Sequence, residues 1–216
     1  MKIATTEITV RNEILALTNQ RAVFWQRESA LILSDLHIGK TAHFRRHGIP
    51  IPDSILQKDL LRLGQLITYF KPTQLLIVGD LFHAESNTDL NTFENWINQF
   101  NTLRMVLIKG NHDRISTAVA ERFKLSIMSP SLFIPPLNFV HDYEETLFNH
   151  FCISGHTHPG VLMEGKGRQR IKLPCYQLTD NQLILPAFSL FTGLNTRQAP
   201  KDCEVFAFTD TAIFKV

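Results

Sequence analysis

Cysteine is scarce in this chain and is not grouped. Cys152, Cys175 and Cys203 lie far apart and form no C-x-x-C motif. Their spacing argues against a disulfide framework or a structural zinc site, and it favours a reducing compartment. No apolar run reaches the roughly 18 residues of a membrane span, and Met1–Val10 lacks the apolar core of a signal peptide. We therefore expect a cytoplasmic protein without a membrane partner.

A strong excess of either charge is also missing. The 22 Lys and Arg residues nearly balance the 20 Asp and Glu residues, which leaves a formal net charge of +2. This balance does not by itself indicate a nucleic-acid partner, so any such argument depends on local patches. The 216 residues, 44% of them hydrophobic, are enough for a substantial core. Because we find no internal repeat or linker, we expect one domain over residues 1–216.

What the sequence does contain is a repeated pattern, in which a short apolar run is followed by Asp, Asn or His. Such runs are typical of buried strands. They are Leu31–Ser34, Leu75–Val78, Val106–Ile108 and Phe151–Ile153.

Segments with helical spacing of apolar residues lie between and after the first three runs. We expect helices over residues 55–70, 90–100 and 116–123, the first of them capped by Asp53 or Ser54. A polar, basic loop is expected over Gly39–Pro52, and strand-like segments dominate after about residue 125. This order predicts an α/β fold in which two sheets pack face to face with helices outside.

The polar residues after the apolar runs predict a metal site. The carboxyl ends of parallel strands meet at one edge of a sheet, where ligands bind. Asp, His and Asn side chains bind divalent metals that activate water. A pair of ions requires a shared carboxylate, and we assign this role to Asp80 in the central run. Each motif alone is more often an ordinary turn, but their joint occurrence after predicted strands favours the metal site.

The residues after Asn111 suggest chemistry on the substrate side. Asn111 offers a carbonyl oxygen to a metal, and His112 is then too crowded to bind the same ion. We therefore expect His112 to face the substrate and Asp113 to orient it.

Four segments together resemble the signature of the calcineurin-like metallophosphoesterases. They are Asp35-x-His37, Gly79-Asp80, Gly110-Asn111-His112-Asp113 and Gly155-His156-Thr157-His158. The resemblance implies a four-layer α/β/β/α sandwich of two mixed sheets flanked by helices. It also implies two divalent metal ions, most often Mn²⁺, and a His112 that protonates the leaving group or binds the scissile phosphate. The metal ligands that it implies are Asp35, His37, Asp80 and His158 for one ion, and Asp80, Asn111, His156 and a further histidine for the other.

Two residues compete for the place of that further histidine. His141 follows the strand-like segment Leu137–Val140 and would lie at a strand tip. His150 precedes the strand that leads to Gly155, where a surface position is more usual. We favour His141 because ligands lie at the carboxyl ends of strands.

A narrower resemblance points to DNA. Residues 79–83, Gly-Asp-Leu-Phe-His, are similar to a motif of the SbcD-type nucleases, which makes His83 a catalytic candidate; a surface or helix-capping role is the alternative. Residues 21–25, 35–40, 44–50, 173–175 and 185–188 resemble the bacterial ligase-associated metallophosphoesterases. That family is described as a DNA-repair endonuclease and is encoded beside an ATP-dependent DNA ligase and a helicase, so the resemblance implies these partners. Ser189 departs from the glycine expected there.

Two basic groups are candidates for contacts to a polyanion. Lys40, Arg45 and Arg46 lie on the loop that leaves the Asp35 tip, and we expect them to bind substrate phosphates. Arg168, Arg170 and Lys172 alternate, as on one face of a strand. That stripe is equally consistent with a charged edge strand that prevents aggregation.

The function predicted from the sequence is a Mn²⁺-dependent phosphodiesterase that acts on DNA, most simply an endonuclease of DNA repair. The alternative within the superfamily is a phosphodiesterase for cyclic nucleotides or nucleotide-linked lipids, because the metal motifs do not select a substrate. A third hypothesis is a scaffold that has lost its chemistry. The presence of every ligand type and of His112 argues against it.

Overall fold

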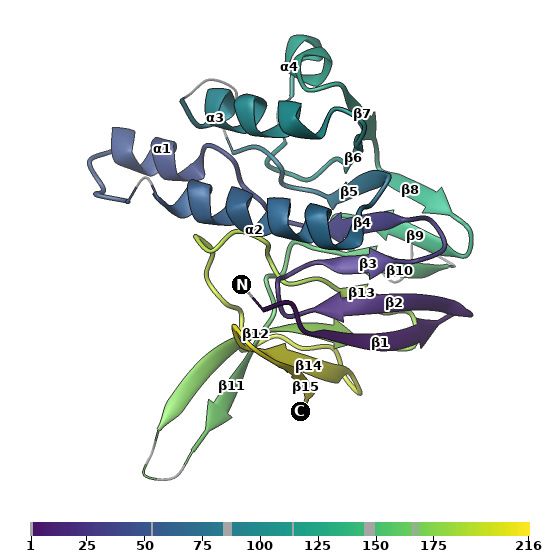
Figure 1. The fold of residues 1–216 in the computed structure, drawn as a ribbon. Helices are drawn as coiled ribbons and strands as arrows, with labels where there is room; N and C mark the ends of the chain where they lie inside the picture. The colour runs from purple at the N-terminus through teal and green to yellow at the C-terminus, as the bar shows by residue number, and fades with distance from the viewer. Residues whose placement is uncertain are drawn as a thin grey trace.

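Two mixed β-sheets pack face to face, with the helices on the outer side of the first sheet (Figure 1). The computed structural model describes residues 2–52, 54–83, 88–113, 115–144, 150–165, 167 and 169–216. Among these residues, no helix is both long and apolar enough to span a membrane. The predicted α/β fold with two facing sheets is confirmed.

The first sheet has the strand order β1-β2-β3-β4-β5-β6-β7. Its first four strands form an antiparallel meander, and from β4 onward the neighbours run parallel. Its strands are β1 (Thr5–Val10), β2 (Glu13–Thr18), β3 (Val23–Trp25), β4 (Ala30–Leu33), β5 (Gln74–Val78), β6 (Arg104–Ile108) and β7 (Leu125–Met128).

The second sheet has the order β15-β14-β12-β13-β10-β9-β8, and β11 pairs with β12 outside this path. At its centre β9, β10 and β13 run parallel, while its remaining pairs are antiparallel. Its strands are β8 (Ser131–Ile134), β9 (Leu137–Val140), β10 (Phe151–Ser154), β11 (Gly160–Glu164), β12 (Arg170–Leu178), β13 (Gln182–Ile184), β14 (Glu204–Phe208) and β15 (Ile213–Lys215).

Two apolar cores explain why the central strands are apolar on both faces. In β4, Ala30 and Ile32 face the core between the sheets, whereas Leu31 and Leu33 face the core beneath the helices. All four of these residues are fully buried. The helices are α1 (Lys40–Arg46), α2 (Ser54–Phe70), α3 (Thr88–Ile97), extended by a 3₁₀ turn at Asn98–Phe100, and α4 (Thr117–Arg122).

The structure differs from the sequence-based expectation in four places. Helix α1 lies within the predicted loop Gly39–Pro52, and strands β7 and β11 were not expected. The predicted cap at Asp53 falls outside the described residues. In the described part of the chain the second sheet has no helical layer, and residues 198–200 lie against its outer face beside Gln177. Strands β11 and β12 form a ribbon that projects from the body (Figure 1).

Candidate metal centre

The parallel strands of the first sheet deliver three predicted ligands to one edge. Asp35, Asp80 and Asn111 follow β4, β5 and β6 by two or three residues. Backbone hydrogen bonds between the tips hold them together: the amide of Asp35 donates to Gly79 O at 3.1 Å, and that of His37 donates to Asp80 O at 2.9 Å. The positions of these side chains therefore follow from the register of the strands.

The second sheet contributes its ligands at the same end of the sandwich. His141 follows β9 and His156 follows β10, and these two strands are parallel neighbours. The amide of Gly155 donates to His141 O at 3.1 Å. The amide of His156 donates to Oδ2 of Asp35 at 3.1 Å, which links the two sheets directly at the candidate site.

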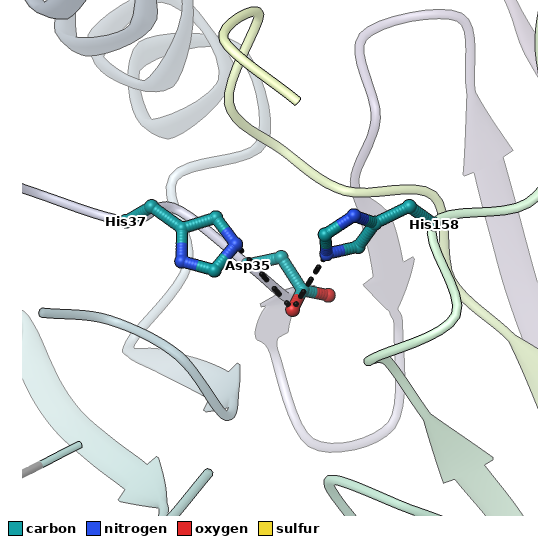
Figure 2. A group of neighbouring side chains, drawn as sticks. All are labelled: Asp35, His37 and His158. Atoms are coloured by element: carbon teal, nitrogen blue, oxygen red, sulfur yellow. Dashed lines mark ion pairs between the residues drawn. The ribbon is translucent and has the colours of Figure 1, made fainter. Parts of the chain in front are cut away.

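Asp35, His37 and His158 form the first group that can hold a metal ion, since one donor atom from each lies within 4.8 Å of the others. Figure 2 shows both imidazole rings turned toward Oδ1 of Asp35, which lies 3.2 Å from Nε2 of His158 and 3.9 Å from Nε2 of His37. Burial and nearby Lys40 lower the pKa of His37 to about 3. Its imidazole is therefore neutral and keeps a lone pair for a metal.

Asp35, Asp80 and His141 form the second such group and share Asp35 with the first. Nε2 of His141 lies 3.5 Å from Oδ1 of Asp80, 3.0 Å from Oδ1 of Asn111 and 3.3 Å from Nδ1 of His156. Burial opposes ionisation of Asp80, but hydrogen bonding and charge from His141 outweigh it and lower the pKa of Asp80 to about 2. The carboxylate is therefore ionised at neutral pH.

The donor atoms of this site fit divalent metal ions. Oδ1 of Asp35 and both ring nitrogens of His37 are buried and, within the described chain, have no hydrogen-bond partner. Such atoms are costly to bury unless another partner binds them. Carboxylate, imidazole and amide donors together suit ions such as Mn²⁺ or Zn²⁺. The site thus meets the requirements of a metal centre on donor type, burial and proximity.

Left-handed backbone recurs at the candidate ligands. Positive φ angles occur at Asp35 (56°), His37 (51°), Asp80 (51°), His156 (68°) and His158 (50°). Non-glycine residues rarely adopt this conformation, and clusters of them are typical of functional sites. The sharp turns bring Asp35, His37 and His158 into one group of donor atoms. His156 lies outside both groups, with its Nδ1 3.3 Å from Nε2 of His141.

Close contact with the ligands explains the glycine beside Asp80. Gly79 has φ of +82°, and a Cβ atom there would overlap the ring of His141. Nδ1 of His141 also lies 3.1 Å from the carbonyl oxygen of Val78, which is within hydrogen-bond distance. The tip of β5 therefore determines where His141 lies.

Two further histidines line the approach to the centre. The ring of His112 lies 6.0 Å from that of His37 and 5.6 Å from that of His83. The amide of His112 donates to Oδ1 of Asp80 at 3.0 Å. His43, on α1, continues this row with a ring 5.2 Å from His83. The structure thus places both His112 and His83 beside the candidate ligands.

Asp113 differs from its predicted role. Its carboxylate accepts hydrogen bonds from the amides of Phe82 at 3.0 Å and Gly110 at 2.9 Å. In the described chain no hydrogen bond joins it to the ring of His112. Asp113 is 1% exposed and joins two strand tips, so its contribution is to the backbone rather than to the orientation of His112.

The structure also separates the two rivals for the further ligand. His141 is buried among the other candidate ligands, whereas His150 is exposed and stacks on Phe133 with ring centroids 4.3 Å apart. His150 therefore lies against strand β8, and the second metal-binding group contains His141.

The predicted basic contacts divide into two kinds. Lys40 lies beside the centre, since Asp35 and Asp80 both act on its pKa, which burial nevertheless lowers. Arg45 instead forms an ion pair with buried Asp89 at 3.4 Å, so a carboxylate of the protein itself balances its charge. Arg46 is exposed on the last turn of α1.

In the second basic group, Arg170 and Lys172 both lie exposed on β12. Arg170 pairs with Glu164 across the β11–β12 ribbon at 3.0 Å, which favours a charged edge strand there. Arg168 lies outside the described residues.

Sequence reasoning missed a buried charged cluster behind the centre. Arg21, Asp59 and Arg62 surround the segment 187–190, which lies between strands β13 and β14 of the second sheet. Asp59 accepts from the amide of Leu190 at 3.1 Å, Arg21 donates to the carbonyl of Ala187 at 2.7 Å, and Arg62 donates to that of Phe188. No local motif marks these residues, because their partners are more than 120 positions away in the chain.

This charged cluster acts on the site through the segment that it holds. The amide of Phe188 donates to Ser34 O at 2.8 Å, and the amide of Ser189 donates to Asp35 O at 3.1 Å. Ser189, which stands in place of an expected glycine, is 4% exposed. The segment therefore fixes the backbone of Asp35 from the side opposite to β5.

Comparison with known proteins agrees with this geometry. The sequence model of the calcineurin-like phosphoesterase family matches residues 29–193. The nuclease MPE of Pseudomonas putida has a similar structure, with a TM-score of 0.82 and 27% identity over 99% of this chain and 100% of that chain. Yfce, a phosphoesterase from E. coli, is matched with a TM-score of 0.47 and 16% identity over 87% of this chain and 97% of that chain. No curated protein sequence matches the chain.

The family match spans more than half of the chain and includes every candidate ligand. The protein belongs to the calcineurin-like phosphoesterase family and is a hydrolase of phosphoester bonds. The two clusters of carboxylate and imidazole groups at the strand tips can bind metal.

Proposed function

We propose that the protein is a Mn²⁺-dependent phosphodiesterase that cleaves DNA, most simply as an endonuclease. The observation that carries this proposal is the pair of metal-binding groups that share Asp35, with His112 and His83 beside them. Likeness to a nuclease along the whole chain supports a nucleic acid as the substrate class. We further propose a cytoplasmic role in DNA repair, with an ATP-dependent DNA ligase and a helicase as partners.

The two groups of donor atoms in the structure have Asp35 in common, whereas the shared ligand expected from the sequence is Asp80. In our proposal Asp80 is shared between the ions. Two bound divalent ions would lower the pKa of water and neutralise charge that develops on the phosphate. The full set of proposed ligands is Asp35, His37, Asp80, Asn111, His141, His156 and His158.

The histidines beside the ligands supply the remaining functions. His112 is held by the hydrogen bond of its amide to Asp80, and in our proposal its ring protonates the leaving oxygen. Burial, together with Lys40, His112 and His43, lowers the pKa of His83. The His83 ring is therefore neutral and suits a hydrogen bond to a phosphate oxygen. Lys40 and Arg46 on α1 extend positive charge from the centre toward the neighbouring phosphates.

A circular DNA substrate tests the proposal most directly. Purified protein with Mn²⁺ is incubated with single-stranded DNA circles and, separately, with a chromogenic phosphodiester. Asp80→Asn, which replaces the shared carboxylate by a neutral amide of the same shape, is the matched control. Linear products from the wild type but not from the variant would support an endonuclease, because a circle has no ends. Hydrolysis of the chromogenic diester with intact circles would instead favour a small-molecule phosphodiesterase.

A further inference from the structure

A small pocket of about 280 Å³ lies on the outer face of the second sheet, next to the metal centre. Its floor contains Ser154, Gln177 and Gln182, which are 1%, 2% and 8% exposed. Thr157, between the candidate ligands His156 and His158, also lines it. The pocket is large enough for one planar ring system and smaller than most sites for drug-sized ligands.

The floor of this pocket retains hydrogen-bonding capacity. Among the described residues no hydrogen bond is seen for the side-chain amide of Gln177, which lines the pocket. The hydroxyl of Thr157 also lacks a partner, but it is buried beneath the surface. Gln182 donates to the hydroxyl of Ser154 at 2.7 Å, which leaves its carbonyl oxygen available. The side-chain amides of Gln177 and Gln182 thus line the same small space.

The charge of the lining narrows the class of ligand. The one charged side chain that lines the pocket in the described chain is Asp142, at the exposed rim. A phosphate group would be repelled by this carboxylate and would find no cation. A neutral ligand with amino or amide groups fits the side-chain amides, and Ile184 and Pro200 supply apolar surface for the faces of a planar ring. A nucleobase has these properties.

The rim of the pocket adjoins the metal centre. Oδ2 of Asp142 lies 3.9 Å from Nε2 of His156, and Asp142 directly follows His141. Gly155 and Thr157, on either side of His156, both line the pocket. A nucleotide with its phosphate at the metal centre could therefore direct its base past His156 into the pocket.

We propose that this pocket is a nucleobase subsite, which binds the base of a nucleotide next to the scissile phosphate. The inference rests on the proposed function for the identity of the substrate, and it adds recognition of the base to cleavage of the backbone. The amide of Gln177 would bind the hydrogen-bonding edge of the base, as enzymes that accept single bases do. The enzyme would then prefer diesters that carry a base over diesters without one.

Calorimetry on the Mn²⁺-loaded protein tests the subsite separately from DNA cleavage. The probes are the four deoxynucleoside 5′-monophosphates and deoxyribose 5-phosphate, which has the same phosphate but no base. We expect at least one nucleotide to bind on the order of tenfold more tightly than the sugar phosphate. Gln177→Leu should weaken that nucleotide about threefold to tenfold, because one hydrogen bond to a neutral group is lost. Its affinity for the sugar phosphate should stay unchanged.

Two further variants exclude trivial explanations. Gln177→Met keeps the length of the side chain and should reproduce the effect if the amide is responsible. Gln65→Leu, on α2 away from the site, should have no effect. Equal affinities for nucleotides and sugar phosphate, or an equal loss for both in the Gln177 variants, would overturn the subsite and leave a pocket that holds only water. Base-dependent affinity together with intact DNA circles would refute the nuclease and support the subsite.

Discussion

Replacement of Arg62 should strongly destabilise the folded protein, although Arg62 is not a candidate metal ligand. Arg62 and Asp59 are 6% and 1% exposed and are joined by a 2.7 Å ion pair on helix α2. The guanidinium also lies 4.3 Å from the ring centroid of Phe188 and donates to its carbonyl. Arg62→Met fills much of the same space but leaves the carboxylate of Asp59 buried without its cation.

The magnitude follows from the burial of the pair. Burial raises the pKa of Asp59 and lowers that of Arg62, so desolvation opposes both charges even when they are paired. The pair itself therefore adds little stability, but breaking a buried pair on one side typically costs about 3–5 kcal/mol. For a chain of this size that corresponds to a fall in Tm of about 6–20 °C. The double variant Asp59→Leu/Arg62→Met should recover part of the loss, because it removes the buried carboxylate together with its ion-pair partner.

Urea and thermal unfolding of the wild type and both variants measure the differences in unfolding free energy and in Tm. A Mn²⁺ titration of each protein measures the affinity of the metal site. We expect weaker Mn²⁺ binding in Arg62→Met, because the segment 187–190 that holds Ser34 and Asp35 loses an anchor. A single variant that loses less than about 1 kcal/mol, or a double variant less stable than the single one, would refute the desolvation argument.

Three further predictions concern the centre itself. His112→Ala should lower turnover of a phosphodiester by about 10²- to 10⁴-fold with metal content near wild type; a parallel loss of metal by elemental analysis would make it a ligand. His141→Ala should lose both bound Mn²⁺ and activity, whereas its control His150→Ala should match the wild type in both assays. Gly79→Ala should weaken Mn²⁺ binding and cost at least about 1–3 kcal/mol in urea unfolding, because of its left-handed φ and the overlap with His141. Unchanged Mn²⁺ affinity in that variant would show that the tip of β5 does not determine where His141 lies.

The position of the site was accessible from the sequence because local patterns encode it. Asp35, Asp80 and Asn111 each follow a short apolar run, and parallel pairing of β4, β5 and β6 brings these tips together. The alternation of strands and helices made that pairing predictable. His141 was predictable for the same reason, since it too follows a strand.

Other features were not accessible because long-range packing determines them. Helix α1 was expected to be a loop, because it is short and basic and its N-cap residue, Gly39, provides no side-chain cap. Asp89 on α3 stabilises it by accepting a hydrogen bond from Thr41 and pairing with Arg45. The ion pair of Asp59 and Arg62 looks in sequence like any charged pair on a helix surface. The partners of Asp113 could not be predicted either, because they are backbone amides on two different tips.

The left-handed backbone at five candidate ligands should affect local unfolding at the metal site. Each such residue costs on the order of 1–3 kcal/mol, so the strain at this end rivals the roughly 5–15 kcal/mol that keep a whole domain folded. Ions that bind only the ordered site would offset this cost by mass action. We therefore expect the amides of residues 35–37 and 156–158 to exchange with deuterium far faster after chelation than with Mn²⁺ present. The amides of the buried strands β4 and β10 beside them should stay protected in both states.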